Sequence, residues 1–198
     1  LQHKLQAKLG GDDAGLLQRS VATIVAQVDA MKTLVNEFRD YARLPAAQLV
    51  ALDLNALVTQ VLALYGDATD RGRLVAACAP GLPPIQGDAV QLRQVVHNLV
   101  QNALDAVAER PDGRVQVSTE LVRGDKGDTR AVRLAVQDNG PGFSDKVLKR
   151  AFEPYVTTKS KGTGLGLAVV KKIADEHGAR LRAGNLVAEE GAPATGAR

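Results

Sequence analysis

A stripe of apolar side chains runs along the early part of the chain. Its members alternate at spacings of four and three residues, the heptad spacing of a helix that packs against another helix. They are Leu17, Val21, Ile24, Val28, Met31, Val35 and Phe38. Pro45 predicts that this helix ends at Arg43 or Leu44. Two interpretations stay open: a helix packed on its own domain and, favoured by so narrow a seam, a helix of a dimeric bundle.

The segment before the stripe has the pattern of an earlier helix. Leu1, Leu5 and Leu9 repeat every four residues, and the Gly/Asp-rich stretch over residues 10–15 predicts the turn of a helical hairpin. The chain opens within this pattern and without a methionine. We therefore expect it to be a fragment of a longer protein.

After the proline, helical and strand-like patterns alternate. Helices are predicted over residues 53–70, 89–109 and 164–177, with a short one over 145–150. Strands are predicted over residues 73–79, 114–122, 130–137 and 180–187. Asp53 or Asn55 is suited to cap the first helix, Asp88 the second, and Gly178 to close the third. This order predicts an α+β fold, a mixed and mostly antiparallel sheet with helices on one face.

Composition adds a few limits. Of the 198 residues, 45% are hydrophobic and 24% charged, which is ordinary for a globular protein, and the net charge of +3 is too small to indicate nucleic-acid or membrane binding. The single cysteine, Cys78, excludes an internal disulfide and predicts a small core residue in a reducing, cytoplasmic setting. No apolar run approaches the roughly 20 residues of a membrane span, so we expect no direct membrane contact.

Two asparagines stand out on the helix predicted over residues 89–109. Asn98 and Asn102 are one turn apart and therefore point the same way. Asparagine is a mediocre helix former, so the pair calls for an explanation. An amide oxygen suits a hard cation such as Mg²⁺, which keeps several waters and phosphate oxygens as ligands. A solvated polar face is the alternative.

A glycine-rich turn follows the strand predicted over residues 130–137. It reads Asp138-Asn139-Gly140-Pro141-Gly142. A carboxylate at a strand end, beside glycines that let a flat ligand approach, can accept a hydrogen bond from an exocyclic amine such as that of adenine. An ordinary turn is the alternative.

The last two clusters precede and open the final helix. The first is Phe152-Glu153-Pro154-Tyr155, followed by Thr157-Thr158-Lys159; a loop with two anchoring aromatic residues is the alternative interpretation. The second is Gly162-Thr163-Gly164-Leu165-Gly166-Leu167. Backbone N–H groups at a helix N-terminus bind phosphate, and glycines let it come close. The polar segment before this cluster excludes a dinucleotide-binding loop, which needs a preceding parallel strand.

In this order, the four clusters resemble the catalytic domain of sensor histidine kinases, within the wider ATPase superfamily of gyrase, Hsp90 and MutL. Residues 98–102 are similar to the family's N box, 138–142 to its first glycine box, 152–155 to its F box and 162–167 to its second glycine box. The match covers residues 50–187 and looks most like the nitrogen-regulation branch, NtrY/NtrB-like. It implies a Bergerat-type ATP-binding α/β sandwich over residues 47–198, with a truncated last strand. Residues 1–46 would be a partial dimerisation and histidine-phosphotransfer hairpin.

The resemblance also implies roles for individual residues toward ATP and Mg²⁺. Asn102 would hold Mg²⁺, Asn98 would support the phosphates or the waters of the metal, and these two are the expected catalytic residues. Asp138 would bind adenine and Lys159 a phosphate, beneath a lid over residues 142–164. Further nucleotide contacts are expected from Gly140, Gly142, Phe152, Thr158, Gly162, Thr163, Gly164, Leu165, Gly166 and Leu167.

The implied reaction passes the γ-phosphoryl group of ATP to a histidine, and then to an aspartate on the receiver domain of a response regulator. ATP or ADP, a second copy bound through the helix over residues 16–44, and that receiver domain are the implied partners; the parent protein could be anchored in an inner membrane. His3, His97 and His177 lack the flanking acid and proline of an acceptor motif, so we expect no autophosphorylation.

Two other functions compete with this one. A hydrolytic ATPase of the gyrase or MutL class would carry a Glu at position 98, where this chain has an asparagine that cannot act as a general base. A non-catalytic module for dimerisation and nucleotide binding is the second alternative.

Overall fold

The structure is a computed structural model that describes residues 11–124, 129–159, 162–186 and 197. The chain divides into two compact units. The first comprises Leu1–Leu44 with Lys159–Thr163, and the second comprises Pro45–Thr158 with Gly164–Arg198. Each unit is described by itself.

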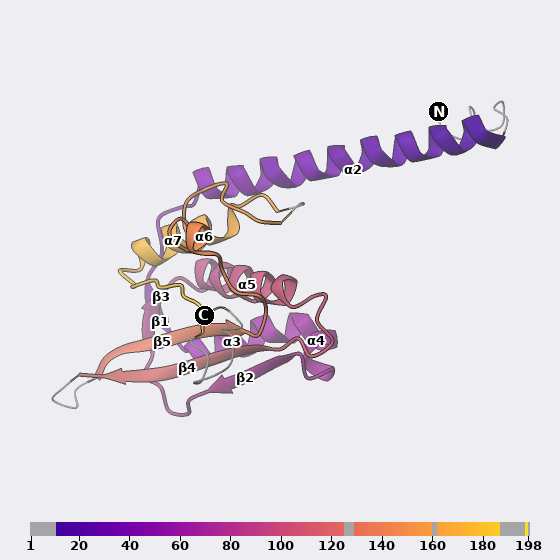
Figure 1. The fold of residues 1–198 in the computed structure, drawn as a ribbon. Helices are drawn as coiled ribbons and strands as arrows, with labels where there is room; N and C mark the ends of the chain where they lie inside the picture. The colour runs from indigo at the N-terminus through magenta and orange to yellow at the C-terminus, as the bar shows by residue number, and fades with distance from the viewer. Residues whose placement is uncertain (1–10, 125–128, 160–161, 187–196, 198) are drawn as a thin grey trace. The chain divides into compact units, whose positions relative to one another are not determined.

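The first unit is built on one long helix, α2 (Gly11–Ala42) (Figure 1). The predicted hairpin turn was wrong over residues 11–15, which are helical. Each glycine costs a helix only about 1 kcal/mol, and the helix continues far beyond them. The end of α2 lies close to the predicted one. The apolar stripe is largely exposed in this single chain, with Ile24 at 62%, Met31 at 67% and Val35 at 61%.

The second unit contains two small sheets. Strands β2 (Leu74–Cys78), β4 (Val115–Arg123) and β5 (Thr129–Asp138) form a mixed sheet in the order β2-β4-β5. β2 runs parallel to β4, and β4 runs antiparallel to β5, as predicted for that pair. Strands β1 (Val50–Leu52) and β3 (Ile85–Gly87) form a separate antiparallel pair. Three residues are too few to show an alternating pattern, which is why the sequence did not predict β1 and β3.

The helices of this unit follow the predicted order. They are α3 (Leu54–Leu62), the 3-10 turn η1 (Ala63–Tyr65), α4 (Gly66–Asp70), α5 (Ala89–Ala106), α6 (Asp145–Leu148) and α7 (Gly166–Glu176). The predicted caps are confirmed: the Asp53 carboxylate accepts from the N–H of Ala56, and Asp88 accepts from the first turn of α5. The predicted helix over residues 53–70 is broken into α3, η1 and α4.

The strand predicted over residues 180–187 was wrong for residues 180–186, which form only one isolated bridge, between Asn185 and Ala197. Small residues at 183 and 184 leave little side chain to pack on a sheet face. Asn185 instead holds the main chain of Phe143, donating to its carbonyl and accepting from its N–H over 2.7 Å each. Val187 lies outside the described residues.

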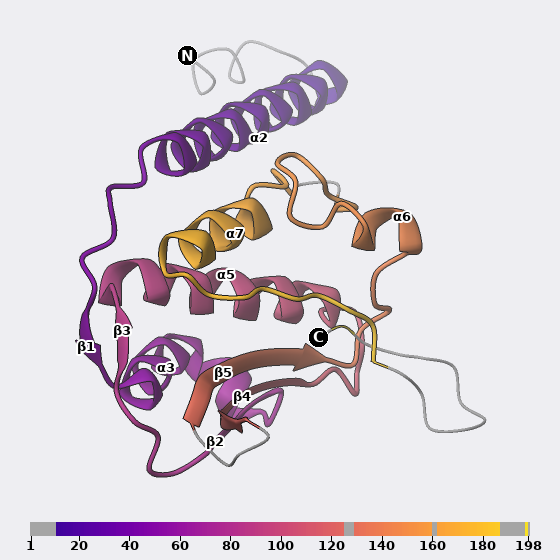
Figure 2. The same ribbon diagram turned by 90° about the vertical axis from the view of Figure 1, so that its left-hand side faces the viewer.

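Helix α5 is the centre of the second unit. It lies between α7 and the β2-β4-β5 sheet in both ribbon views (Figure 2). Its buried side packs with α3 and β4 through Val58, Val96, Val100, Val115 and Val117, all at most 1% exposed. Cys78 is half-buried against this core, as predicted. Among the described helices, none is both long and apolar enough to cross a membrane.

Candidate functional site

The two asparagines of α5 face the start of α7. The side-chain Nδ2 of Asn98 donates to the carbonyl of Gly166 over 3.3 Å. A Cβ added to Gly166 would lie 3.6 Å from the Nδ2 of Asn102. Both asparagines are half-buried. The structure therefore brings both asparagines to Gly166 of the predicted second glycine box, and the alternative of a solvated polar face does not hold.

The carboxylate of Asp138 lies at the end of β5, and the turn that follows it contacts the C-terminal end of α5. Asp138 is 8% exposed, and its Oδ1 accepts from the N–H of Gly140 over 2.8 Å. Burial raises the pKa of this carboxyl, while hydrogen bonds from the main chain of Gly140 and Ala197 act to lower it. A Cβ on Gly140 would lie 3.0 Å from the Ala106 carbonyl and 2.8 Å from the Asp138 Oδ1, so a larger residue there would require the Asp138 side chain or Ala106 to shift.

The predicted F box packs on the second glycine box. Gly164 has a φ of +72°, and a Cβ there would lie 2.6 Å from the main-chain carbon of Tyr155. The N–H of Tyr155 donates to the Gly164 carbonyl over 3.0 Å, and Tyr155 itself has a φ of 65°. This conformation is uncommon for a residue with a side chain, and such strain is frequent at functional sites. Tyr155 is 56% exposed, so it is not the second anchoring aromatic of a plain loop.

The N-terminus of α7 has the form of a phosphate site. The helix begins at Gly166 after Leu165, which is fully buried and provides no side-chain cap. The first N–H groups of a helix lack partners within the helix, and a phosphate can accept from them. Four more of the predicted nucleotide contacts lie in the second unit. Leu167 and Phe152 are half-buried, and Thr158 is exposed. Gly142 has a φ of +73°.

Together, these contacts join α5 to the buried carboxylate of Asp138 at its C-terminal end and to the start of α7 along its length. The family model described as "Histidine kinase-, DNA gyrase B-, and HSP90-like ATPase" matches residues 87–198, more than half of the chain. The chain belongs to this family.

The similar proteins place the chain in the histidine-kinase branch of this family. The sensory histidine kinase/phosphatase NtrB of Rhizobium leguminosarum bv. phaseoli is 31% identical over 197 residues, covering 90% of this chain and 51% of NtrB. The solved catalytic domain of the histidine kinase ThkA is 27% identical with a TM-score of 0.60, covering 76% of this chain and 91% of that domain. Full-length ShkA, solved with AMPPNP, is 31% identical with a TM-score of 0.65, covering 91% of this chain and 37% of ShkA. The resemblance to sensor histidine kinases is thus confirmed, and the chain spans about half the length of NtrB.

Three of the residues predicted to contact the nucleotide belong to the first unit of the chain. Lys159, Gly162 and Thr163 group with α2, where the Thr163 hydroxyl donates to the carboxylate of Glu37. The N–H of Gly162 donates to the Lys159 carbonyl over 3.3 Å. Asn102 belongs to the second unit, and the nucleotide contacts of these three residues stay predictions.

The histidines of the described chain have structural partners. The Nδ1 of His97 pairs with the Tyr65 hydroxyl over 2.7 Å. The Nε2 of His177 accepts from the N–H of Asp88 over 3.0 Å while its Nδ1 donates to the Ile173 carbonyl over 2.8 Å. His177 thereby ties the end of α7 to the cap of α5. His3 lies outside the described residues.

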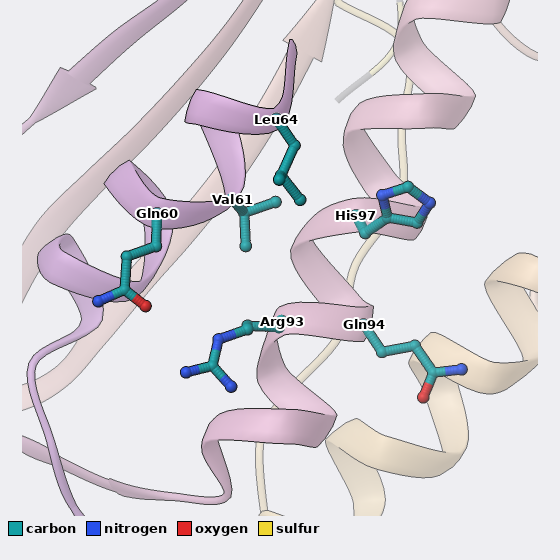
Figure 3. A pocket seen from close by; sticks show the side chains of 6 residues that line it. All are labelled: Gln60, Val61, Leu64, Arg93, Gln94 and His97. Carbon is teal, nitrogen blue, oxygen red and sulfur yellow. The ribbon is translucent and has the colours of Figure 1, made fainter.

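The second unit also has a surface groove, apart from the residues predicted to bind the nucleotide. It runs between α3 with η1 and α5 (Figure 3), and its lining residues are Gln60, Val61, Leu64, Arg93, Gln94 and His97. In Figure 3, Val61 and Leu64 point from α3 and η1 toward α5. None of the predicted nucleotide contacts lines this groove. The predicted nucleotide site therefore does not coincide with this groove.

Sequence reasoning missed two residues of the site. Ala106 forms the wall that Gly140 approaches, and it follows Asn102 by one helical turn, which was the available signal. The side chain of Asn139 makes hydrogen bonds with the main chain of the turn before β4. Its place between Asp138 and Gly140 was the only clue in the sequence.

Proposed function

We propose that this chain is the ATP-binding catalytic unit of an NtrY/NtrB-like sensor histidine kinase. It would pass the γ-phosphoryl group of ATP to a histidine on another helix, and from there to an aspartate of a response-regulator receiver domain. The observation that carries the proposal is that α5 supports both ends of a nucleotide site. Its Asn98 is bonded to Gly166 at the start of α7, and its Ala106 contacts the turn that holds Asp138.

Asp138 would select the adenine base. Its ionised carboxylate can accept the exocyclic amine of adenine while its Oδ1 keeps the bond from Gly140. A buried acceptor that loses its donor is left unpaired, so a base without that amine binds less well. The carboxylate is thus suited to discriminate ATP from GTP, which has a carbonyl at the same position.

Asn102 would contribute the protein ligand to Mg²⁺. In the described part of the chain, no group of three or more His, Cys, Asp or Glu side chains is placed to hold a metal. A single amide oxygen fits an ion that takes its other ligands from phosphates and water. When bound, Mg²⁺ supplies charge neutralisation for phosphoryl transfer. Asn98, with its amide N–H bonded to Gly166, would keep the second glycine box against α5.

The site favours transfer to a protein side chain over hydrolysis. An amide at position 98 cannot take a proton from water. The one carboxylate in the sequence of α5 is Asp105, which is exposed and accepts a bond from the Gln101 amide over 2.8 Å. Helix α5 therefore offers no suitable general base to activate water, whereas a gyrase-type enzyme would carry a Glu at position 98.

Helix α2 would provide association with a second copy. Its apolar stripe is exposed, with Val28 and Phe38 each at 49% and Met31 at 67%. Burying such a side chain fully contributes about 1.5–3 kcal/mol, so a second α2 is the natural partner of this seam. His97 and His177 are held in hydrogen bonds and have no acceptor motif, so we expect the phosphoryl acceptor to lie outside this chain.

Titration calorimetry tests the proposal. We expect the wild-type chain to bind ATP in Mg²⁺, to bind it more weakly in EDTA, and to prefer it over GTP. Asn102→Ala should lower the affinity for Mg-ATP at least about a hundredfold, because a metal ligand is lost, and leave the affinity measured in EDTA nearly unchanged. A wild-type chain that does not bind ATP, or an Asn102→Ala chain with the wild-type response to Mg²⁺, would refute the site assignment.

A further inference from the structure

Asn139 makes hydrogen bonds that the proposed nucleotide chemistry does not use. Its Nδ2 donates to the carbonyl of Asp112 over 2.9 Å, and its Oδ1 accepts from the N–H of Arg114 over 2.7 Å. Its main-chain N–H donates to the Arg114 carbonyl over 3.1 Å. The last pair of the β4–β5 ladder joins Val115 to Asp138. The side chain of Asn139 therefore extends this pairing by one residue, directly beside the base-reading carboxylate.

The turn that Asn139 bonds is itself attached to the end of α5. The Nη2 of Arg73 donates to the carbonyl of Val107, the C-cap of α5, over 2.6 Å. The Nε of Arg73 donates to the carbonyl of Gly113 over 3.4 Å. Gly113 is buried, and a Cβ there would lie 2.6 Å from the Val107 carbonyl. The turn over residues 110–114 is thus packed directly on the end of α5 and has little room to shift.

The other side of Asn139 is also packed on α5. Gly140 approaches Ala106 so closely that a Cβ would lie 3.0 Å from the Ala106 carbonyl. Ala106 lies one turn after Asn102 on the same helix. Asn139 therefore closes a ring of contacts that runs from Asp138 through the turn to α5 and back through Gly140. The position of Asp138 relative to Asn102 depends on this ring.

We propose that Asn139 is a positioning residue: it holds the Asp138 carboxylate in place against α5 and so sets the preference for adenine nucleotides, without contacting the nucleotide. This inference rests on the proposed function. Without the Asn139 side chain, the N–H of Arg114 and the carbonyl of Asp112 lose their partner. The end of β5 can then shift, and the hydrogen bond to the adenine amine is misaligned.

The test compares ATP and GTP binding to the wild-type and Asn139→Ala chains by calorimetry. We expect the affinity for ATP to fall about tenfold, the effect of one misaligned hydrogen bond, and the affinity for GTP to change little. The ATP/GTP preference therefore falls about tenfold. Because Asn139 acts through Asp138, the double variant Asp138→Ala/Asn139→Ala should bind ATP as Asp138→Ala alone does, within about twofold.

Asn55→Ala is the matched control. The Asn55 side chain also makes two bonds, donating to the Ala79 carbonyl and accepting from the Thr119 hydroxyl, each over 2.7 Å. Thr119 lies within the sheet and pairs with Leu134, away from the Asp138 end of β5. Asn55→Ala should lower the melting temperature as Asn139→Ala does, yet keep the wild-type ATP/GTP preference. Asn139→Thr, whose hydroxyl can keep one bond, should lose only about threefold in preference.

An unchanged ATP/GTP preference in folded Asn139→Ala and Asn139→Thr chains would overturn the inference, because the bonds would then serve stability alone. Losses that add in the double variant would overturn it as well, since Asn139 would act independently of Asp138. A wild-type chain with no preference for ATP, or an Asp138→Ala chain that keeps the preference, would instead overturn the adenine role of Asp138. The two failures are therefore distinguishable.

Discussion

The two ends of the proposed nucleotide site are built in different ways. At the adenine end, Asp138 and Gly140 are packed between the end of β5 and α5, and the carboxylate is 8% exposed. At the phosphate end, the chain between β5 and α7 contains only the four-residue helix α6 among its described residues. There, Tyr155 and Thr158 are exposed, and the turn depends on the positive φ of Gly164.

The difference indicates a division of roles. The adenine end is tightly packed, so it would select the base at little cost in ordering. The exposed Tyr155 and Thr158 at the phosphate end suit the predicted lid, a segment that would close over its ligand. We therefore expect changes at the adenine end to alter selectivity, and changes at the phosphate end to alter how tightly the phosphates are held.

After Asn102→Ala, the largest effect is expected from Asp138→Asn. The new amide would direct an N–H at the amine of adenine, so the affinity for ATP should fall about thirtyfold, the loss of a hydrogen bond to a charged group. Calorimetry with ATP and GTP measures this, and the affinity for GTP should not fall. An equal loss for both nucleotides would show that Asp138 does not read the base.

Asp138→Asn should weaken ATP binding but raise the stability of the fold at neutral pH. Burial raises the pKa of Asp138 in the folded chain, so its contribution to stability is fully present below the unfolded pKa and is lost as pH rises through the folded pKa. Asp138→Asn removes this dependence. We expect the variant to be more stable than the wild type at neutral pH, and the gap to narrow as pH is lowered through the folded pKa. Urea unfolding across that range checks the sign.

Gly164→Ala should have the next largest effect, now at the phosphate end. Alanine at this positive φ costs about 1–2 kcal/mol, and its Cβ would overlap the main chain of Tyr155. Gly178→Ala is the control, because Gly178 has a φ of +60° and open space around it. Both variants should lose stability, but only Gly164→Ala should also lose about tenfold in ATP affinity. Equal ATP affinities in the two variants would show that Gly164 has no role in nucleotide binding.

Asn98→Ala is expected to have the smallest effect. It removes the bond of 3.3 Å to the Gly166 carbonyl but no metal ligand, so the affinity for Mg-ATP should fall only about fivefold. The measurement compares Asn98→Ala with Asn102→Ala at several Mg²⁺ concentrations. A weaker dependence on Mg²⁺ in the Asn98→Ala chain than in the Asn102→Ala chain would exchange the roles of the two asparagines.

Local sequence signals predicted much of this fold. The caps Asp53 and Asp88, the period of α5 and the alternation of β4 and β5 are each encoded within a few neighbouring residues. β1 and β3 escaped prediction because their three-residue strands depend on a partner more than thirty positions away. The strand predicted over residues 180–187 had an alternating pattern but too little side chain to pack.

The site shows the same limit. The asparagine pair and the glycine clusters could be predicted, since amides one turn apart and glycines at a helix start have a chemical meaning by themselves. The roles of Ala106 and Asn139 could not, because an alanine and a turn asparagine acquire meaning only from their contacts. For Asn139, those contacts lie 25 and 27 positions earlier in the chain.

Phosphoryl transfer in trans tests the central claim most directly. The chain is incubated with ATP labelled at the γ-phosphate, with and without a separate helical hairpin that carries an acceptor histidine. The account predicts acid-labile label on the hairpin, none on the chain, and loss of transfer in Asn102→Ala. Acid-labile label on the chain itself, or release of free phosphate at the same rate whether or not the hairpin is present, would contradict it.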